Sequence, residues 1–190
     1  MRIFIGIKLD KTVHQRVESF LEPFKKIKSP VRWVKPANIH ITLRFIGEMD
    51  QKKYSQMEAA LNELSQDAVL APLDIELQGC GKFGRNKTLN ILWIGVKQNP
   101  QLEELYHKIE DVLDKIGIAE EPRAFKAHIT VGRNKKNFDF QPFFNLIDQL
   151  GVQPISRFIT DRFQVFKSEL LPSGPIYSIL KEIPLTHAGT

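Results

Sequence analysis

A short motif occurs twice in the chain and limits the folds that the sequence can adopt. Residues 40–43 read His-Ile-Thr-Leu, and residues 128–131 read His-Ile-Thr-Val. Each copy lies in a segment of strand-like composition that follows a segment with helical periodicity. This repeated order predicts two similar units of helix and strand, arranged as two lobes that face each other.

Three segments have apolar residues at the spacing of an α-helix. They are residues 13–24 behind Asp10, residues 54–64 behind Asp50, and residues 102–116 between Asn99 and Gly117. Asp and Asn are favoured as N-caps because their side-chain oxygens accept hydrogen bonds from the first free N–H groups. A weaker helical pattern covers residues 143–150.

Seven segments are rich in β-branched and aromatic residues and are expected to be strands. They are residues 2–9, 39–46, 73–83, 89–96, 127–133, 162–171 and 176–183. The turn residues at 172–175 predict a hairpin between the last two. The mixed order of strands and helices predicts an α+β fold with a largely antiparallel sheet, helices outside and a central cleft. We expect residues 1–190 to form one bilobal domain with half-sites at residues 40–43 and 128–131.

Composition excludes several classes of protein. The single cysteine, Cys80, excludes an intramolecular disulfide framework and zinc sites that need two or more thiolates. The N-terminal segment turns polar too soon for a signal peptide, and no run of ~18 apolar residues occurs, so we expect a cytoplasmic protein with no membrane partner. The net charge of +5 is compatible with an anionic partner such as RNA but identifies none.

The repeated motif has a clear chemical use. Side chains alternate across a strand, so His40 and Thr42 share one face, and His128 and Thr130 share another. Two histidines can divide proton transfer between a general acid and a general base, and two hydroxyls can bind phosphate oxygens. One histidine in a strand is more often an ordinary polar residue, but that reading does not explain the repetition. The set suits hydrolysis of a phosphodiester, above all a cyclic one, with no metal and no cofactor.

The residues around both motifs resemble those of a known family. Residues 32–48 and 125–133 contain the motifs, and residues 81–83, 92–96, 166–170 and 174–177 extend the similarity over nearly the whole chain. The sequence resembles the 2H phosphoesterase superfamily and, within it, the RNA 2′,3′-cyclic phosphodiesterases, also called 2′-5′ RNA ligases. Ala127 departs from the proline that is common before the second histidine, a change that affects backbone stiffness rather than chemistry.

The resemblance implies a bilobal fold with a pseudo-twofold axis and a site between the lobes. It implies metal-free hydrolysis of RNA that ends in a 2′,3′-cyclic phosphate, which leaves a 2′-phosphate. His40 would be the acid that protonates O3′, His128 the base that activates water, and Thr42 and Thr130 the phosphate ligands. Members of the family also join RNA ends through a 2′-5′ linkage without ATP, with the roles of the two histidines exchanged.

Five further residues are candidate substrate contacts. Arg44 has the strand parity of His40, although a solvated strand-end charge is the alternative, and Lys126 has the parity of His128. Arg133 resembles a frequent family arginine, but ideal alternation places it opposite His128, so a bulge or a strand end is needed. Phe83 and Tyr177 are candidates for base stacking, with core packing as the alternative for Phe83.

Other functions remain open at this point. A cyclic mononucleotide or a cyclised ADP-ribose product is an alternative substrate, and a module that binds nucleotides or RNA ends without turnover is another alternative. We expect an RNA partner with a 2′,3′-cyclic phosphate end, tRNA halves among them, and a monomeric protein.

Overall fold

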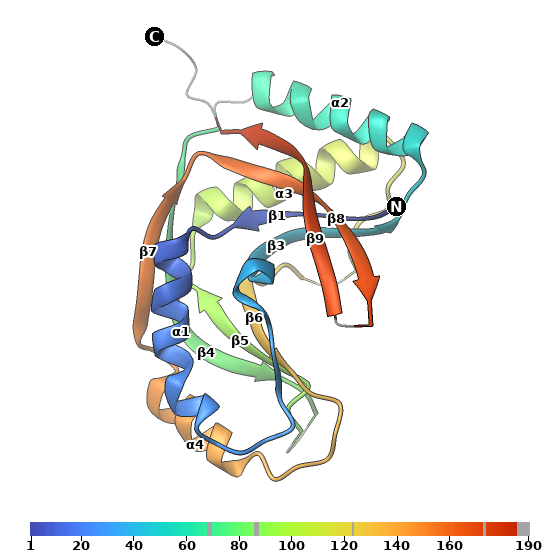
Figure 1. Cartoon of the computed structure of the whole chain (residues 1–190). Coiled ribbons are helices and arrows are strands. Elements are labelled where there is room, and N and C mark those ends of the chain that lie inside the picture. The colour runs from blue at the N-terminus through green and yellow to red at the C-terminus, as the bar shows by residue number, and fades with distance from the viewer. Residues whose placement is uncertain (68–69, 86–87, 123, 173, 186–190) are drawn as a thin grey trace.

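One antiparallel sheet contains all nine strands of the part of the chain that the structure describes (Figure 1). The computed structural model describes residues 1–67, 70–85, 88–122, 124–172 and 174–185. The strands are β1 (Arg2–Lys8), β2 (Arg32–Trp33), β3 (His40–Glu48), β4 (Leu73–Phe83), β5 (Ile91–Val96), β6 (His128–Arg133), β7 (Pro154–Thr160), β8 (Arg162–Leu171) and β9 (Gly174–Pro184). Their order in the sheet is β7-β4-β5-β6-β3-β1-β8-β9, and β2 pairs with β6.

The sheet has two halves that meet at the strands of the two motifs. One half is β3-β1-β8-β9 and the other is β6-β5-β4-β7. A single residue pair, Ile41 with Ile129, joins β3 to β6. The repeated unit is strand, helix, strand in each half of the chain, which is the order that the repeated motif predicts. The predicted α+β class with an antiparallel sheet is therefore confirmed.

The helices begin where the sequence predicts. They are α1 (Lys11–Lys25), α2 (Gln51–Asp67), α3 (Pro100–Lys115) and α4 (Gln141–Leu150), with a short 3-10 turn, η1 (Pro36–Asn38), before β3. The carboxylates of Asp10 and Asp50 each accept a backbone N–H three residues later at 2.8 Å, and Asn99 accepts one at 3.0 Å. These bonds satisfy N–H groups that a helix leaves free at its start.

The helices are exchanged between the two halves of the sheet. Helix α1 follows β1, yet it packs with α4 against the half that contains β7 and β4. Helix α3 precedes β6, yet it packs against α2, which in turn lies on β9. Figure 1 shows α1 and α4 beside β4 and β7 at the lower left, and α2 and α3 above the other half. Each repeated unit therefore supplies the helix that covers the half built around the other unit.

The sequence does not predict strands β7 and β2, but it does predict the hairpin of β8 and β9. Strand β7 pairs with β4 at the edge of the sheet, where it begins at Pro154 and exposes Ile159, so its apolar pattern is weak. Strand β2 has only two residues. The predicted hairpin of β8 and β9 is present, with Leu171 paired to Gly174, while Ser173 lies outside the described residues.

Both motif strands contain a β-bulge at the same position. Strand β3 has two extra residues relative to its partner β1: Leu43, next to the motif, and Ile46, farther along the strand. Strand β6 has one extra residue, Val131, relative to its partner β5. Leu43 and Val131 are each the fourth residue of their motif. An extra residue reverses the alternation of faces for the side chains beyond it, so ideal alternation fails after both motifs.

The bulge in β3 corrects the expectation for Arg44. Its side chain points away from the His40 face and is only 6% exposed. Its Nε lies 2.8 Å from Oε1 of Glu110 on α3, and its Nη1 lies 3.3 Å from a carboxylate oxygen of Glu121. Arg44 also donates to the carbonyl of Ala119. The parity argument for a phosphate contact at Arg44 is therefore wrong, because this arginine joins β3 to α3 and the segment after it.

We expect Arg44→Ala to lower the free energy of unfolding by about 3–5 kcal/mol, since it leaves the Glu110 carboxylate buried without a counter-ion. Urea unfolding at neutral pH measures the change. The matched control is Arg162→Ala, which removes an exposed arginine paired with Asp161 and Glu182. The control should have a much smaller effect. Equal losses in the two variants would contradict the role of the buried pair.

Candidate active site

The two His-x-Thr motifs lie side by side where β3 meets β6. Because the two strands run antiparallel around the Ile41–Ile129 pair, His40 lies toward Thr130, and the other histidine lies toward the other threonine. The isoleucine side chains are fully buried on the opposite face. All four predicted catalytic and phosphate-binding residues therefore come together at one junction, with the imidazoles from different strands.

Both histidine rings are held in the same tautomer by the same backbone contact. His40 Nδ1 donates to the carbonyl of Asn38 at 2.8 Å, and His128 Nδ1 donates to the carbonyl of Lys126 at 2.6 Å. A carbonyl can only accept, so Nδ1 carries the proton and Nε2 is the free nitrogen of the neutral ring. The Thr42 hydroxyl lies 3.1 Å from His40 Nε2 and donates to it. Each ring thus has Nε2 ready for proton transfer.

Aromatic side chains fix the ring of His40. Phe4 on β1 stacks on it with a centroid distance of 4.6 Å, and Tyr177 on β9 meets it edge-on at 5.3 Å. The side chain of Asn38 donates to the carbonyl of Pro175 at 2.8 Å, so the turn that orients His40 is itself tied to β9. The predicted residue Tyr177 therefore lies at the site.

A matching set of side chains surrounds His128. Phe83 on β4 lies edge-on at 5.2 Å and Trp93 on β5 at 6.4 Å. The ammonium group of Lys126 lies 4.7 Å from the centroid of the Trp93 ring. That ring also covers Gly81, where an added Cβ would lie 2.3 Å from a ring carbon. Only glycine leaves room for the indole here, and the predicted residues Phe83 and Lys126 both lie beside the second histidine.

Both imidazoles favour the neutral form. Burial lowers the pKa of His40 from 6.5 to about 4, against the hydrogen bond to Asn38, and the charges of Arg133 and His128 lower it further. Burial also lowers the pKa of His128, with smaller contributions from the charges of Lys126 and Arg133. Neutral rings at pH 7 can accept a proton, and a bound anion would raise the pKa of both.

The bulge in β6 brings Arg133 toward the site. Ideal alternation would place it opposite His128, but the extra residue Val131 reverses the parity. The charge of Arg133 acts on both histidines and on Tyr177. The structure therefore contains the β-bulge that Arg133 needs in order to lie on the same face as His128.

Phe45 holds the place in β3 that Arg133 holds in β6, five residues after the histidine. Its ring is 42% exposed, and the guanidinium of Arg2 lies 5.0 Å from the ring centroid.

Sequence reasoning missed Phe45, Arg2, Phe4 and Trp93 because their positions depend on bulges and on pairing with distant strands. It missed the contact of Asn38 too, although the same two-residue offset before each histidine was a usable signal.

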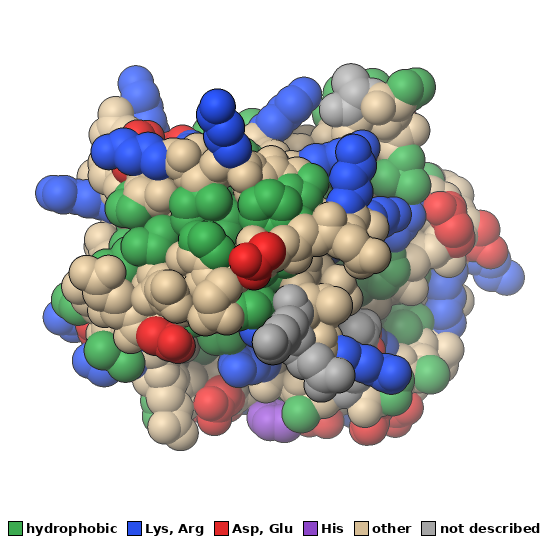
Figure 2. Space-filling view, turned by 90° about the horizontal axis from the view of Figure 1, so that it is seen from below, with side chains coloured by type: hydrophobic (Ala, Val, Ile, Leu, Met, Phe, Trp, Pro, Cys, Tyr) green, Lys and Arg blue, Asp and Glu red, His purple; other side chains and the backbone are tan. Residues whose placement is uncertain are grey.

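The Cys80 thiol, the possible metal ligands and the surface charge each limit the chemistry of the site. Burial raises the pKa of the Cys80 thiol to about 11, so it stays protonated at neutral pH. Among the residues described here, no group of three or more His, Cys, Asp or Glu side chains is placed to hold a metal ion. On the face seen in Figure 2, lysine and arginine side chains project from several separate positions. The net charge thus marks no continuous RNA track on that face.

None of the helices within the described ranges is long and apolar enough to cross a membrane.

The lowered pKa of His40 predicts acid sensitivity. Between pH 6.5 and about 4, the unfolded chain binds a proton at His40 that the folded protein excludes. The free energy of unfolding therefore falls as the pH drops through this window, by roughly 3 kcal/mol for this group, and is restored above it. Urea unfolding at about pH 7 and about pH 4.5 measures the loss. We expect His40→Gln to lose less stability on acidification than the wild type, and an equal loss would contradict the assignment.

Comparison with known proteins agrees with this geometry. The family model described as the 2′-5′ RNA ligase superfamily matches residues 13–170. Proteins named RNA 2′,3′-cyclic phosphodiesterase are similar to this chain. The Thermotoga maritima protein is 32% identical over 96% of this chain and 94% of its own length. The Archaeoglobus fulgidus protein is 31% identical over 95% and 98%.

Solved structures share the fold. The crystal structure of TT0787 of Thermus thermophilus matches with a TM-score of 0.81 and 23% identity over the full length of both chains. Apo E. coli LigT matches with a TM-score of 0.76 and 20% identity over 98% of both chains. With the family match over most of its length and two relatives above 30% identity, the chain belongs to the 2′-5′ RNA ligase superfamily.

Proposed function

We propose that the protein hydrolyses 2′,3′-cyclic phosphate ends of RNA to 2′-phosphates. The observation that carries this proposal is the pair of imidazoles from β3 and β6, each with Nδ1 bound to a carbonyl, which leaves Nε2 as the unprotonated nitrogen of the neutral ring. Two such groups on opposite sides of one phosphorus atom can deliver and remove protons in a single displacement. The names of the similar proteins from Thermotoga maritima and Archaeoglobus fulgidus support an RNA substrate.

In the proposed reaction, His128 Nε2 takes a proton from water as the water oxygen forms a bond to phosphorus. The bond between phosphorus and O3′ breaks, and His40 gives its Nε2 proton to O3′. The products are a 3′-hydroxyl and a 2′-phosphate on the same ribose. Thr42 and Thr130 donate hydrogen bonds to the non-bridging oxygens, and no metal takes part.

Substrate binding has to change the protonation of His40. With a pKa near 4, this ring is neutral in the free protein at neutral pH. The negative phosphate favours the imidazolium, so substrate binding raises the pKa of His40 and protonates the ring that acts as the general acid. The charge of Arg133, which lowers the pKa of both histidines in the free protein, becomes available to the phosphate once it binds. Arg133 therefore offsets part of the negative charge that develops in the transition state.

The remaining contacts follow from the walls of the site. Tyr177 and Phe83 border the two imidazoles, and Phe45 offers an exposed ring for a base. Lys126 supplies a positive charge beside His128. In the same active site, the 5′-hydroxyl of a second RNA would take the place of water. Its oxygen bonds to phosphorus as the bond to O3′ breaks, which forms a 2′-5′ linkage without ATP, and the histidine roles are exchanged when this reaction runs in reverse. We also propose that residues 1–190 form one bilobal catalytic domain, which acts as a cytoplasmic monomer on RNA ends that include tRNA halves.

A short RNA with a 2′,3′-cyclic phosphate tests the function. We expect one product, which mass spectrometry shows to have gained one water and selective phosphatase treatment shows to carry a 2′-phosphate. EDTA should leave the rate unchanged. A 3′-phosphate product, or a loss of rate that added metal restores, would contradict the mechanism. Tight binding without hydrolysis over long incubation would favour a binding module instead.

We expect His40→Ala and His128→Ala each to lower turnover by roughly 10²–10⁴-fold, because each removes one proton-transfer group. Circular dichroism and urea unfolding should show that both variants fold. The control is His107→Ala, an exposed histidine on α3 whose loss should leave turnover unchanged. Near-normal turnover in either active-site variant would refute the two-histidine mechanism.

A further inference from the structure

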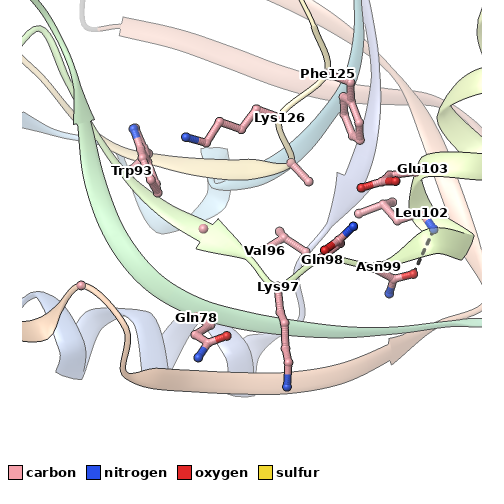
Figure 3. Close-up of a pocket in the computed structure, with 13 residues that line it drawn as sticks. Gln78, Trp93, Val96, Lys97, Gln98, Asn99, Leu102, Glu103, Phe125 and Lys126 are labelled. Carbon is pink, nitrogen blue, oxygen red and sulfur yellow. Dashed lines mark hydrogen bonds between the residues drawn. The ribbon is translucent and has the colours of Figure 1, made fainter.

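A cavity of about 340 Å³ (Figure 3) is lined in part by Lys126 and Ala127, the two residues before His128. It is bordered by the end of β5, the start of α3 and the segment just before β6. Its volume is at the lower end of the range of small-molecule pockets, about 300–1,000 Å³. The two histidines and two threonines do not line it, so the catalytic groups leave it unused.

The cavity adjoins the two-histidine site. Trp93 and Lys126 line it, and the same two residues lie beside His128. Gly95, which also lines it, is paired with His128 across β5 and β6. Figure 3 shows the Lys126 side chain reaching toward Trp93 at one end of the cavity. A substrate that occupies both spaces would therefore lie beside this lysine.

The lining suits a nucleobase better than a phosphate. Val96, Leu102 and Phe125 supply apolar surface, and the amide of Gln98 supplies a donor and an acceptor, while the amide of Gln78 already donates to the carbonyl of Val152 at 3.0 Å. Flat bases with apolar faces and hydrogen-bonding edges match such a mixture, and glutamine amides are common partners of base edges. Of the charged residues inside the cavity, Lys97 is paired with Glu76 at 3.0 Å, and the carboxylate of Glu103 at the start of α3 disfavours a phosphate. The ammonium of Lys126, between the cavity and His128, favours one at the entrance.

We propose that this cavity binds the nucleoside immediately 5′ of the nucleotide that carries the cyclic phosphate, and that Lys126 binds the phosphate between the two. The proposal rests on the proposed function. In that reaction O2′ and O3′ stay on the terminal ribose, so the substrate continues only through its 5′ oxygen. A second binding space beside a lysine fits that continuation.

The cavity therefore gives the enzyme its preference for RNA ends over cyclic mononucleotides. A mononucleotide fills the catalytic site and leaves the cavity empty. A dinucleotide fills both and gains the contacts of one more base. Contacts of a base with aromatic and apolar side chains correspond to roughly 10–100-fold in binding.

The test compares kcat/KM for a 2′,3′-cyclic mononucleotide with that for a dinucleotide ending in the same cyclic nucleotide. We expect the wild type to favour the dinucleotide by roughly 10–100-fold. Gln98→Trp adds an indole to the lining of the cavity at an exposed position, and it should bring the ratio close to one. Gln98→Ala removes the amide without adding bulk and should lower the ratio less. The matched control is Gln15→Trp on α1, which lies outside the cavity lining and should keep the wild-type ratio.

A wild-type ratio near one, or a ratio that Gln98→Trp does not change, would overturn the proposal. An equal loss for both substrates would overturn it too, because the cavity would then hold the terminal base itself. If the wild type hydrolyses neither substrate, the proposed function fails and this proposal fails with it. Hydrolysis of both substrates with equal efficiency leaves the proposed chemistry intact and removes only the cavity assignment.

Discussion

The geometry of the catalytic site depends on the backbone pair between Ile41 and Ile129. This pair joins β3 to β6 and makes one hydrogen-bonded sheet out of two halves. It brings together two imidazoles that come from opposite halves of the chain, and the field of His128 reaches His40. The two isoleucine side chains are fully buried on the other face, so hydrophobic packing holds the junction while the histidines and threonines lie on the face of the candidate site.

The repeated bulge decides which charged side chain serves the site. The extra residues Leu43 and Val131 follow the two threonines at the same distance and turn the later side chains to the opposite face. In β6 this brings the charge of Arg133 to bear on both histidines, whereas in β3 it sends Arg44 into an ion pair with Glu110. The same kind of β-bulge therefore places a charge near the two histidines in one half and a buried ion pair in the other.

The sequence was most informative where a signal is local. The repeated motif, the helix caps at Asp10 and Asn99 and the hydrophobic periods all act over a few residues, and the structure has them as expected. Strand register is not local, because it depends on which strands become neighbours. For that reason Arg44 was placed on the wrong face, and Phe4 and Trp93 had no assigned role, although both contact a catalytic ring. The sequence does not predict strand β7, because an edge strand buries little apolar surface and needs no strict alternation of apolar and polar residues.

The exchange of helices between the two halves has a consequence for how the protein folds. Helix α1 lies against β7 and α4, and α3 lies against α2 and meets β3 through the Arg44 pair. Neither half of the sheet can exclude water from its apolar residues until the helix from the other repeated unit packs against it. Folding should then be all-or-none, with many contacts between residues far apart in the chain and a correspondingly slow rate. A partly folded molecule with one formed half and one exposed imidazole would gain little stability, so the two histidines are assembled in a single cooperative step.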